Sequence, residues 1–157
     1  MLRLIFFVLT LFSVSCVNAG NVRDTYMKMQ VVKGDFDTVR DYIELAITGR
    51  GMIINNVSHI GNMLERTGKD LGATKKIYNK AEALEFCSAS ISRNMMEADP
   101  HNIVFCPYII AIYTLPGEEG KVYVSYRRPQ QVGSNASRQA LAAVEKLLQE
   151  IVEEAVN

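Results

Sequence analysis

Two apolar segments joined by a turn place the strongest constraint on the fold of this 157-residue chain. Residues 103–115 are strongly apolar, residues 122–126 (VYVSY) are rich in β-branched and aromatic side chains, and residues 116–120 (PGEEG) between them are typical of a turn. This pattern predicts a hairpin whose first strand, residues 103–115, lies in the centre of a sheet.

The rest of the chain alternates between strand-like and helix-like segments. Residues 25–32 alternate in polarity and predict a strand, whereas Phe36, Val39, Ile43, Ala46 and Ile47 form one apolar stripe of a helix that Asp35 caps. Further strands are predicted at 52–60 and 77–86, and further helices at 62–71, 88–98 and 134–155, the last capped by Ser134. The prediction is a single α+β domain with about five strands.

Three of these segments leave alternatives open. Asn55 and Asn56 favour either a turn or a bulge within the second strand. The helix at 62–71 is expected to bury Met63 or Leu64 together with Thr67 and Leu71, because its interior Gly68 makes it dependent on packing. Residues 81–84 (AEAL) favour a helix by propensity, although a strand over 77–86 fits the alternation of the chain better.

The first nineteen residues have the features of a secretory signal peptide. Arg3 precedes an apolar run over residues 4–12, and small and polar residues lead to Ala19. This run is about half of the roughly 20 residues that span a bilayer, so we expect cleavage before Gly20 and a mature domain of residues 20–157. The domain is then periplasmic or secreted, with no membrane span.

Cys16 offers a second interpretation of this leader, as the lipid attachment site of a lipoprotein. Ser13 stands where such sites usually have Leu, which makes this alternative the weaker of the two. After cleavage, Cys87 and Cys106 are the two remaining cysteines, and export places them in an oxidising compartment.

Several motifs along the chain resemble one bacterial family. They are residues 58–72 (SHIGNMLERTGKDLG), 86–88 (FCS), 98–100 (ADP), 105–108 (FCPY), 112–113 (IY) and 121–129 (KVYVSYRRP). Together they resemble the exported branch of the domain-of-unknown-function 302 family over nearly the whole mature chain. The resemblance implies a mainly antiparallel sheet covered by helices, often paired into homodimers, and transfers no catalytic residue.

Cys87 and Cys106 are the side chains best suited to chemistry. They predict a structural disulfide that closes a loop of about twenty residues, if the two Cα atoms lie within about 7 Å. Two buried free thiols beside Phe86 and Phe105 are the main alternative. Redox catalysis is the third, and the chain has no C-x-x-C motif to favour it.

His59, Arg66 and Tyr126 are the candidates for ligand binding. His59 precedes a predicted helix, where it caps the helix, binds a metal or acts as a general base oriented by Glu65 or Asp70. Tyr126 lies beside Arg127 and Arg128, a basic and aromatic pattern that could hold an anionic ligand, although adjacent strand residues face opposite sides. The spacing of the His, Cys and Met residues matches no metal or haem motif, so no metal ligand is assigned and the cofactor is unknown.

These observations favour binding over catalysis. Lys and Arg number 17 and balance 17 Asp and Glu, which argues against a nucleic-acid surface, and no phosphate-binding loop or activated nucleophile is recognisable. We therefore expect an exported, non-enzymatic domain that binds an unknown small ligand or protein partner. The alternative is a periplasmic thiol-redox or metal-handling protein that uses Cys87 and Cys106.

Overall fold

The computed structural model describes residues 22–156, so the expected leader and Cys16 lie outside the described residues. The fold is built on one five-stranded sheet in the order β1-β5-β4-β3-β2, in which every neighbouring pair is antiparallel. The strands are β1 (Met27–Lys33), β2 (Ile53–Ser58), β3 (Lys80–Cys87), β4 (Tyr108–Thr114) and β5 (Lys121–Arg127). The expected α+β domain with an antiparallel sheet is confirmed.

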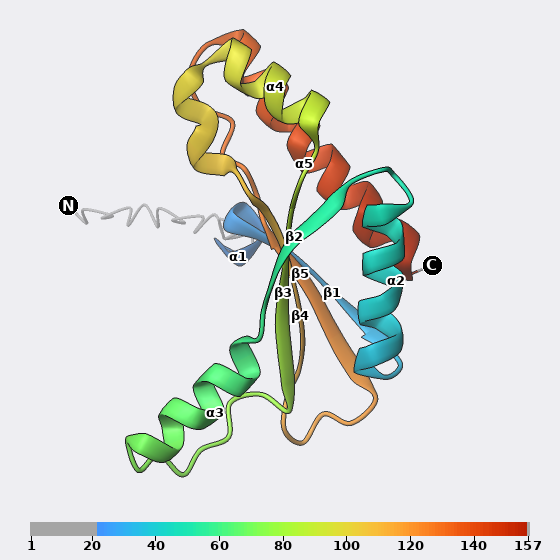
Figure 1. The fold of residues 1–157 in the computed structure, drawn as a ribbon, viewed down its shortest axis with the longest axis vertical. Helices are drawn as coiled ribbons and strands as arrows, with labels where there is room; N and C mark the ends of the chain where they lie inside the picture. Colours follow the sequence, from blue (N-terminus) through green and yellow to red (C-terminus); the bar gives the residue numbers. More distant parts are fainter. Residues whose placement is uncertain (1–21, 157) are drawn as a thin grey trace, which may run out of the picture.

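Helices cover one side of this sheet, as Figure 1 shows with the sheet seen edge-on. Helices α2 (Phe36–Thr48), α4 (Ala89–Ala98) and α5 (Asn135–Val156) pack on that side, which we call the inner face. The short helix α1 (Val22–Tyr26) and helix α3 (Ile60–Asp70) lie on the other side, the outer face, where α3 projects away from the strands. The structure is therefore a layer of helices on a sheet whose second face carries only α1 and α3 among the described helices.

The hydrophobic core lies between the inner face and the three packed helices. Alternate residues of β3, β4 and β5 point into it and meet the apolar stripes of α2 and α5. Its largest fully buried side chains are Phe86, Ile43, Ile47, Leu84, Met95, Ile110, Ile112, Leu141, Ile151, Val122, Val124 and Val144. The stripe predicted for residues 36–47 is buried in full.

Local signals in the sequence position these helices. The Asp35 carboxylate accepts a hydrogen bond from the Thr38 backbone N–H at 2.9 Å and caps α2, and Ser134 Oγ accepts from the Ser137 N–H at 3.2 Å at the start of α5. Gly51, with φ of 73°, takes the left-handed conformation that lets the chain leave α2 for β2.

The strand predicted at 103–115 is wrong in its first part. Residues 100–105 form a 3₁₀ helix, η1 (Pro100–Phe105), and β4 begins at Tyr108 after a cis peptide bond between Cys106 and Pro107. Asp99 caps η1 by accepting the His101 N–H at 2.9 Å, a local hydrogen bond that competes with strand pairing. The first predicted strand likewise starts later than expected, because residues 22–26 form α1.

Helix α3 forms where predicted, but its expected buried face is wrong. None of its residues is buried, Thr67 is exposed, and Leu71, just past the last turn, is 78% exposed. The helix is attached to the sheet at Gly61, where an added Cβ would lie 2.9 Å from the Ala81 backbone nitrogen. Close approach at one glycine, rather than an apolar stripe, holds α3 against β3.

The structure also distinguishes between the alternatives for Asn55-Asn56 and for residues 81–84. The register between β2 and β3 shifts between Ile54 and Asn56, which is the bulge interpretation of the Asn55-Asn56 pair. Residues 81–84 belong to β3, so the strand prediction is confirmed over the helix that propensity favours.

Candidate functional site

Cys87 and Cys106 come together at one end of the sheet. Cys87 is the last residue of β3, and Cys106 follows η1 directly before β4. Because β3 and β4 pair with Phe86 opposite Tyr108, Cys87 lies beside the segment of residues 106–107 that leads into β4. Both thiols are half-buried and unbridged, and Cys106 is among the groups that raise the pKa of Cys87.

Two hydroxyl groups complete this cluster of sulfur and oxygen atoms. Ser92 Oγ of α4 lies 3.5 Å from Cys106 Sγ and 2.9 Å from the Tyr108 hydroxyl. Burial raises the pKa of Tyr108 to about 12, so its phenol is neutral at physiological pH. Burial, and after it the charge of Cys106, also raises the pKa of the Cys87 thiol, although the Tyr108 backbone N–H and Ser92 oppose this by hydrogen bonding to Cys87. Cys87 is therefore a protonated, weakly nucleophilic thiol at neutral pH.

A cavity of about 340 Å³, which we call the Cys106 cavity, opens beside this cluster. Its walls come from α1, from the segment joining η1 to β4, and from the end of β5. The lining residues are Tyr26, Val104, Phe105, Cys106, Pro107, Tyr108, Ile109, Arg127, Arg128, Pro129, Gln130 and Leu148. An apolar wall with a few polar groups is the usual composition of a small-ligand site.

The two arginines of the Cys106 cavity differ in their availability. The Arg128 guanidinium donates to Glu145 Oε1 at 2.6 Å and to the Asp24 carbonyl at 2.8 Å, and these contacts hold α1 against β5. Its pKa is raised above its usual value chiefly by the hydrogen bond to Glu145. Within residues 22–156, no carboxylate pairs with Arg127, which is exposed and lines the same cavity. Arg127 is the cation that remains available to a ligand.

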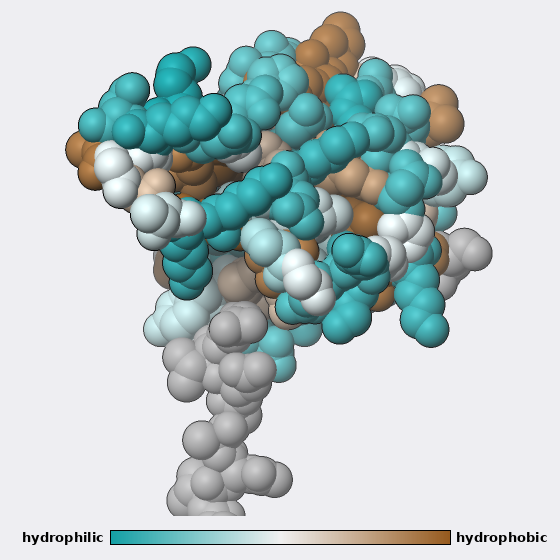
Figure 2. All heavy atoms as spheres, turned by 90° about the horizontal axis from the view of Figure 1, so that it is seen from below, coloured by the Kyte–Doolittle hydropathy of each residue, from teal (hydrophilic) through white to brown (hydrophobic). Residues whose placement is uncertain are grey.

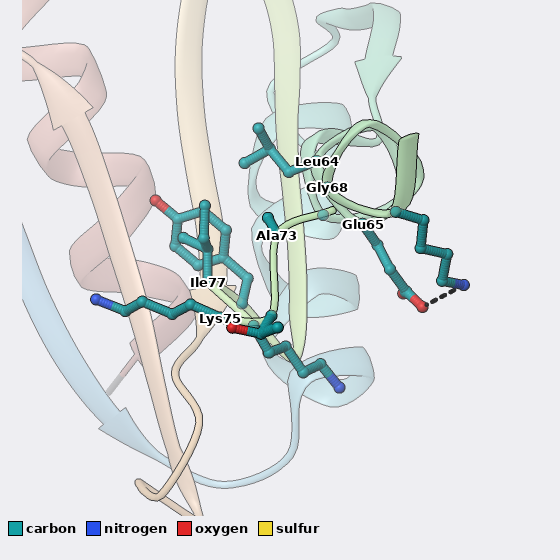
Figure 3. Close-up of a pocket in the computed structure, with 11 residues that line it drawn as sticks. Leu64, Glu65, Gly68, Ala73, Lys75 and Ile77 are labelled. Atoms are coloured by element: carbon teal, nitrogen blue, oxygen red, sulfur yellow. Dashed lines mark ion pairs between the residues drawn. The ribbon is translucent and has the colours of Figure 1, made fainter. Parts of the chain in front are cut away.

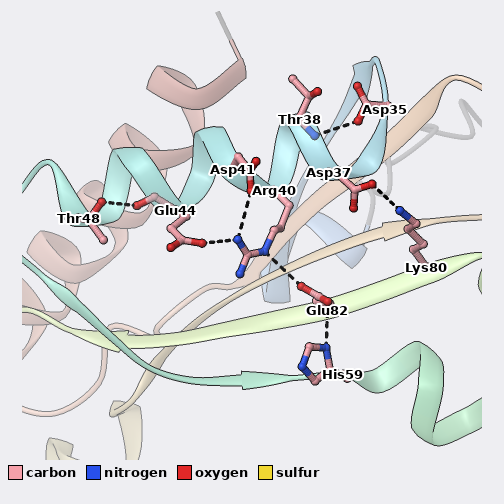
Figure 4. A network of polar contacts seen from close by, with 10 residues as sticks. All are labelled: Asp35, Asp37, Thr38, Arg40, Asp41, Glu44, Thr48, His59, Lys80 and Glu82. Atoms are coloured by element: carbon pink, nitrogen blue, oxygen red, sulfur yellow. Dashed lines mark hydrogen bonds and ion pairs between the residues drawn. The ribbon is translucent and has the colours of Figure 1, made fainter.

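His59 lies elsewhere, in a network of charged side chains at the start of α3 (Figure 4). Its Nδ1 lies 2.9 Å from Glu82 Oε1, and the other oxygen of Glu82 accepts from Arg40 Nε at 3.4 Å. Arg40 also pairs with Asp41 at 3.2 Å and with Glu44. The carboxylate that orients His59 is thus Glu82 of β3 and not Glu65 or Asp70. Because His59 Nδ1 is already hydrogen-bonded to Glu82, we interpret the network as a structural link at the surface between α2, β3 and α3.

Neither of the other two ligand-binding candidates takes part in this network. Arg66 is an exposed residue of α3. Tyr126 lies on the inner face of β5, 5% exposed, where burial raises the pKa of its phenol to about 12. The structure brings Cys87 and Cys106 together and does not bring together His59, Arg66 and Tyr126.

The projecting helix α3 forms a second cavity, of about 220 Å³, with the loop that follows it. Figure 3 shows Leu64 of α3 and Ala73 and Ile77 of the loop on its sides. Of its charged residues, Lys69 pairs with Glu65 at 3.1 Å, and Lys75 and Lys76 are exposed. Figure 2, seen from this end of the molecule, shows hydrophilic side chains over most of the surface and apolar atoms in the hollows between them.

The outer face of the sheet is apolar in its middle. Tyr113 and Tyr123 stack with their ring centroids 5.1 Å apart, Tyr78 meets Tyr113 edge to face, and the Tyr113 hydroxyl contacts Met29 Sδ at 3.4 Å. Neighbouring residues that point the same way are Met27, Val31, Ala81, Ala83, Ile109 and Ala111. Ala81 and Ala83 are buried there, and none of these side chains belongs to the main core cluster on the inner face.

Among residues 22–156, no group of three or more His, Cys, Asp and Glu side chains is placed to hold a metal ion. Over the same residues, no helix combines the length and the apolar character needed to cross a membrane.

Sequence reasoning missed three residues of these sites. Glu82, Ser92 and Tyr108 each contact a predicted site residue through strand pairing or helix packing. No motif marks Glu82 or Ser92, because their partners lie 23 and 14 residues away along the chain. Tyr108 falls within the FCPY motif, which does not indicate its interaction with Cys87.

Comparison with known proteins places this geometry in a wider context. The family model described as "Domain of unknown function DUF302" matches residues 27–155. A crystal structure of an uncharacterized conserved protein DUF302 from Bacillus stearothermophilus superposes with a TM-score of 0.68 at 14% identity, covering 82% of this chain and 97% of the other. At this identity the likeness establishes the fold alone. No curated protein matches the chain.

Proposed function

The chain belongs to the DUF302 family, a domain of unknown function, and from this premise we propose that it is a non-enzymatic binding domain that holds a small carboxylate in the Cys106 cavity. One observation carries the proposal: Arg127, free of carboxylate partners within residues 22–156, lines a cavity that is otherwise mostly apolar. A guanidinium matches the geometry of a carboxylate, and the apolar wall suits the rest of a small organic acid.

Replacing Arg127 with Ala should weaken carboxylate binding. We expect Arg127→Ala to lower the affinity for benzoate about tenfold, the effect of losing one hydrogen bond to a charged group. Titration followed by amide NMR shifts measures this affinity, with benzyl alcohol as the uncharged analogue. Arg93→Ala is the matched control, because Arg93 is an exposed arginine of α4 that pairs with Glu97 at 2.7 Å.

Two results of that titration contradict the proposal. Benzoate that shifts no amide of the Cys106 cavity excludes this cavity as its site. Equal affinities for wild type, Arg127→Ala and Arg93→Ala exclude Arg127 as the anchor.

We propose in addition that the domain acts after export. Residues 1–19 carry the charge and hydropathy pattern of a signal peptide, and this pattern supports a cut before Gly20. The intact mass of the protein isolated from its native cells tests this: a chain that begins at Gly20 is expected, and one that retains residues 1–19 contradicts export by cleavage.

A second copy of the chain is the occupant that we propose for the outer face. Within residues 22–156, two features lie outside the packed core: the apolar middle of the outer face, and helix α3, which buries none of its residues and projects beyond the strands. A two-fold interface is self-complementary, so a second copy of the chain buries the same surfaces on both subunits. Val31, 51% exposed on the outer face of β1, lies within this interface.

A charge at Val31 should therefore abolish pairing. We expect the wild-type protein to sediment as a dimer and Val31→Lys as a monomer, because a lysine in an apolar interface loses its hydration without gaining a partner. Leu45→Lys is the control: Leu45 is 64% exposed on α2, on the other side of the sheet, and this variant should remain dimeric. Wild-type protein that sediments as a monomer at micromolar concentration contradicts the proposal.

A thiol-redox function is the second candidate, and it is favoured by the closeness of Cys87 and Cys106, which share Ser92 as a neighbour. Two neighbouring thiols form a disulfide with little movement of the backbone when their Cα atoms lie within about 7 Å. We propose that in an oxidising compartment this pair is a disulfide, whose formation has consequences for both stability and the Cys106 cavity.

A further inference from the structure

The two thiols differ in their access to the Cys106 cavity. Cys106 is one of its lining residues and Cys87 is not. Cys87 interacts instead with Ser92 and with the Tyr108 backbone N–H. A molecule in the cavity therefore meets Cys106 first.

The charges around the cavity favour an anionic molecule. The lining residues include two arginines and no Asp or Glu. Asp24 and Glu145 lie close by, but both act on Arg128, which leaves the charge of Arg127 unbalanced. The reactive sulfur and the available cation thus share one cavity.

We propose that Cys106 exchanges with small disulfides that carry carboxylates, and that Arg127 selects them by binding a carboxylate. This inference rests on the Cys106 cavity proposed above as a carboxylate site. It adds the class of co-reactant and the order in which the two cysteines act.

The exchange balances in two steps. The Cys106 thiolate, having released its proton to water, attacks one sulfur of the disulfide, so that a bond from Cys106 to that sulfur forms and one thiolate leaves. The Cys87 thiolate then attacks Cys106 Sγ, the protein disulfide forms, and the second thiolate leaves. The two departing thiolates take up the two protons that the cysteines lose, and the small disulfide gains the two electrons. The raised pKa of Cys87 fits its place as the second thiol to react.

The experiment uses three small disulfides of similar size and different charge: dithiodipropionate (anionic), bis-hydroxyethyl disulfide (neutral) and cystamine (cationic). In the reduced Cys87→Ser protein, the second step is blocked and the mixed disulfide at Cys106 accumulates, where intact mass spectrometry measures its rate of formation. Each rate is divided by the rate for N-acetylcysteinamide with the same disulfide, which removes the intrinsic reactivity of the three reagents.

We expect the normalised rate to be about tenfold higher for dithiodipropionate than for cystamine, the ratio given by one hydrogen bond to a charged group. Adding Arg127→Ala should remove this preference, and adding Arg93→Ala should preserve it. In Cys106→Ser, Cys87 should form its mixed disulfide at least tenfold more slowly than Cys106 does in Cys87→Ser.

Three results overturn the inference: equal normalised rates for the three disulfides, a preference that survives Arg127→Ala, or equal reactivity of Cys87 and Cys106. If Cys87→Ser does not fold, Cys87→Ala replaces it, and wild-type protein quenched with acid at short times reports which cysteine is modified first. Benzoate titration separates this failure from that of the binding site: benzoate bound through Arg127 without selective exchange leaves the binding proposal standing.

Discussion

Oxidation of Cys87 and Cys106 to a disulfide is expected to raise the free energy of unfolding by about 3 kcal/mol, the value for closing a loop of this length. The bridge closes a loop of about twenty residues that contains α4 and η1, and it lowers the conformational entropy of the unfolded chain. The native structure should change little, because the two cysteines are neighbours and the backbones of β3 and β4 are fixed by pairing.

Urea denaturation of the oxidised and the reduced protein measures this difference. The double variant Cys87→Ala/Cys106→Ala is the control, and its midpoint should not respond to reductant. An oxidised protein no more stable than the reduced one would show that the bridge distorts the native cluster of Cys87, Cys106, Ser92 and Tyr108.

The substitution Phe86→Ala should destabilise the protein by about 3 to 5 kcal/mol, the range for removing a buried aromatic ring. Phe86 is fully buried on the inner face and meets the Tyr108 ring edge to face, with centroids 5.9 Å apart. Its removal leaves a cavity in the core next to the Cys87–Cys106 pair, since Phe86 precedes Cys87 and pairs with Tyr108.

Leu71→Ala is the matched control for this prediction, because it removes an apolar side chain that is 78% exposed. Its free energy of unfolding should stay within about 0.5 kcal/mol of the wild-type value. A loss of less than 1 kcal/mol in Phe86→Ala, measured by the same urea titrations, would mean that the core collapses around the missing ring.

The periodicity of apolar residues in the sequence was sufficient to predict most helices and strands of the fold. Helix α2 buries the stripe that the 3.6-residue repeat predicts, and the caps of α2 and α5 at Asp35 and Ser134 are those expected from residue type. The predicted elements were wrong where one polar contact or one close atomic approach determines the local structure. Asp99 and the 3₁₀ helix after it replaced the start of a strand, and Gly61 replaced an apolar stripe in holding α3.

The candidate site was less predictable, because its contacts depend on strand register. The sequence identified Cys87 and Cys106 as the side chains best suited to chemistry. Their closeness follows from the pairing of Phe86 with Tyr108, and no local sequence pattern encodes that pairing. His59 shows the same difficulty. Its predicted partners were the nearest carboxylates on its own helix, whereas its actual partner, Glu82, comes from the neighbouring strand.

The bulge in β2 bears on how this molecule avoids aggregation. Strands β1 and β2 form the two borders of the sheet, where backbone N–H and C=O groups lack a neighbouring strand and could recruit another chain without limit. The shift between Ile54 and Asn56 interrupts the regular spacing of those groups on one border. Lys28 and Lys33 place charges on the other border, which discourages the same event. Growth of fibre-like stacks is thereby opposed at both borders.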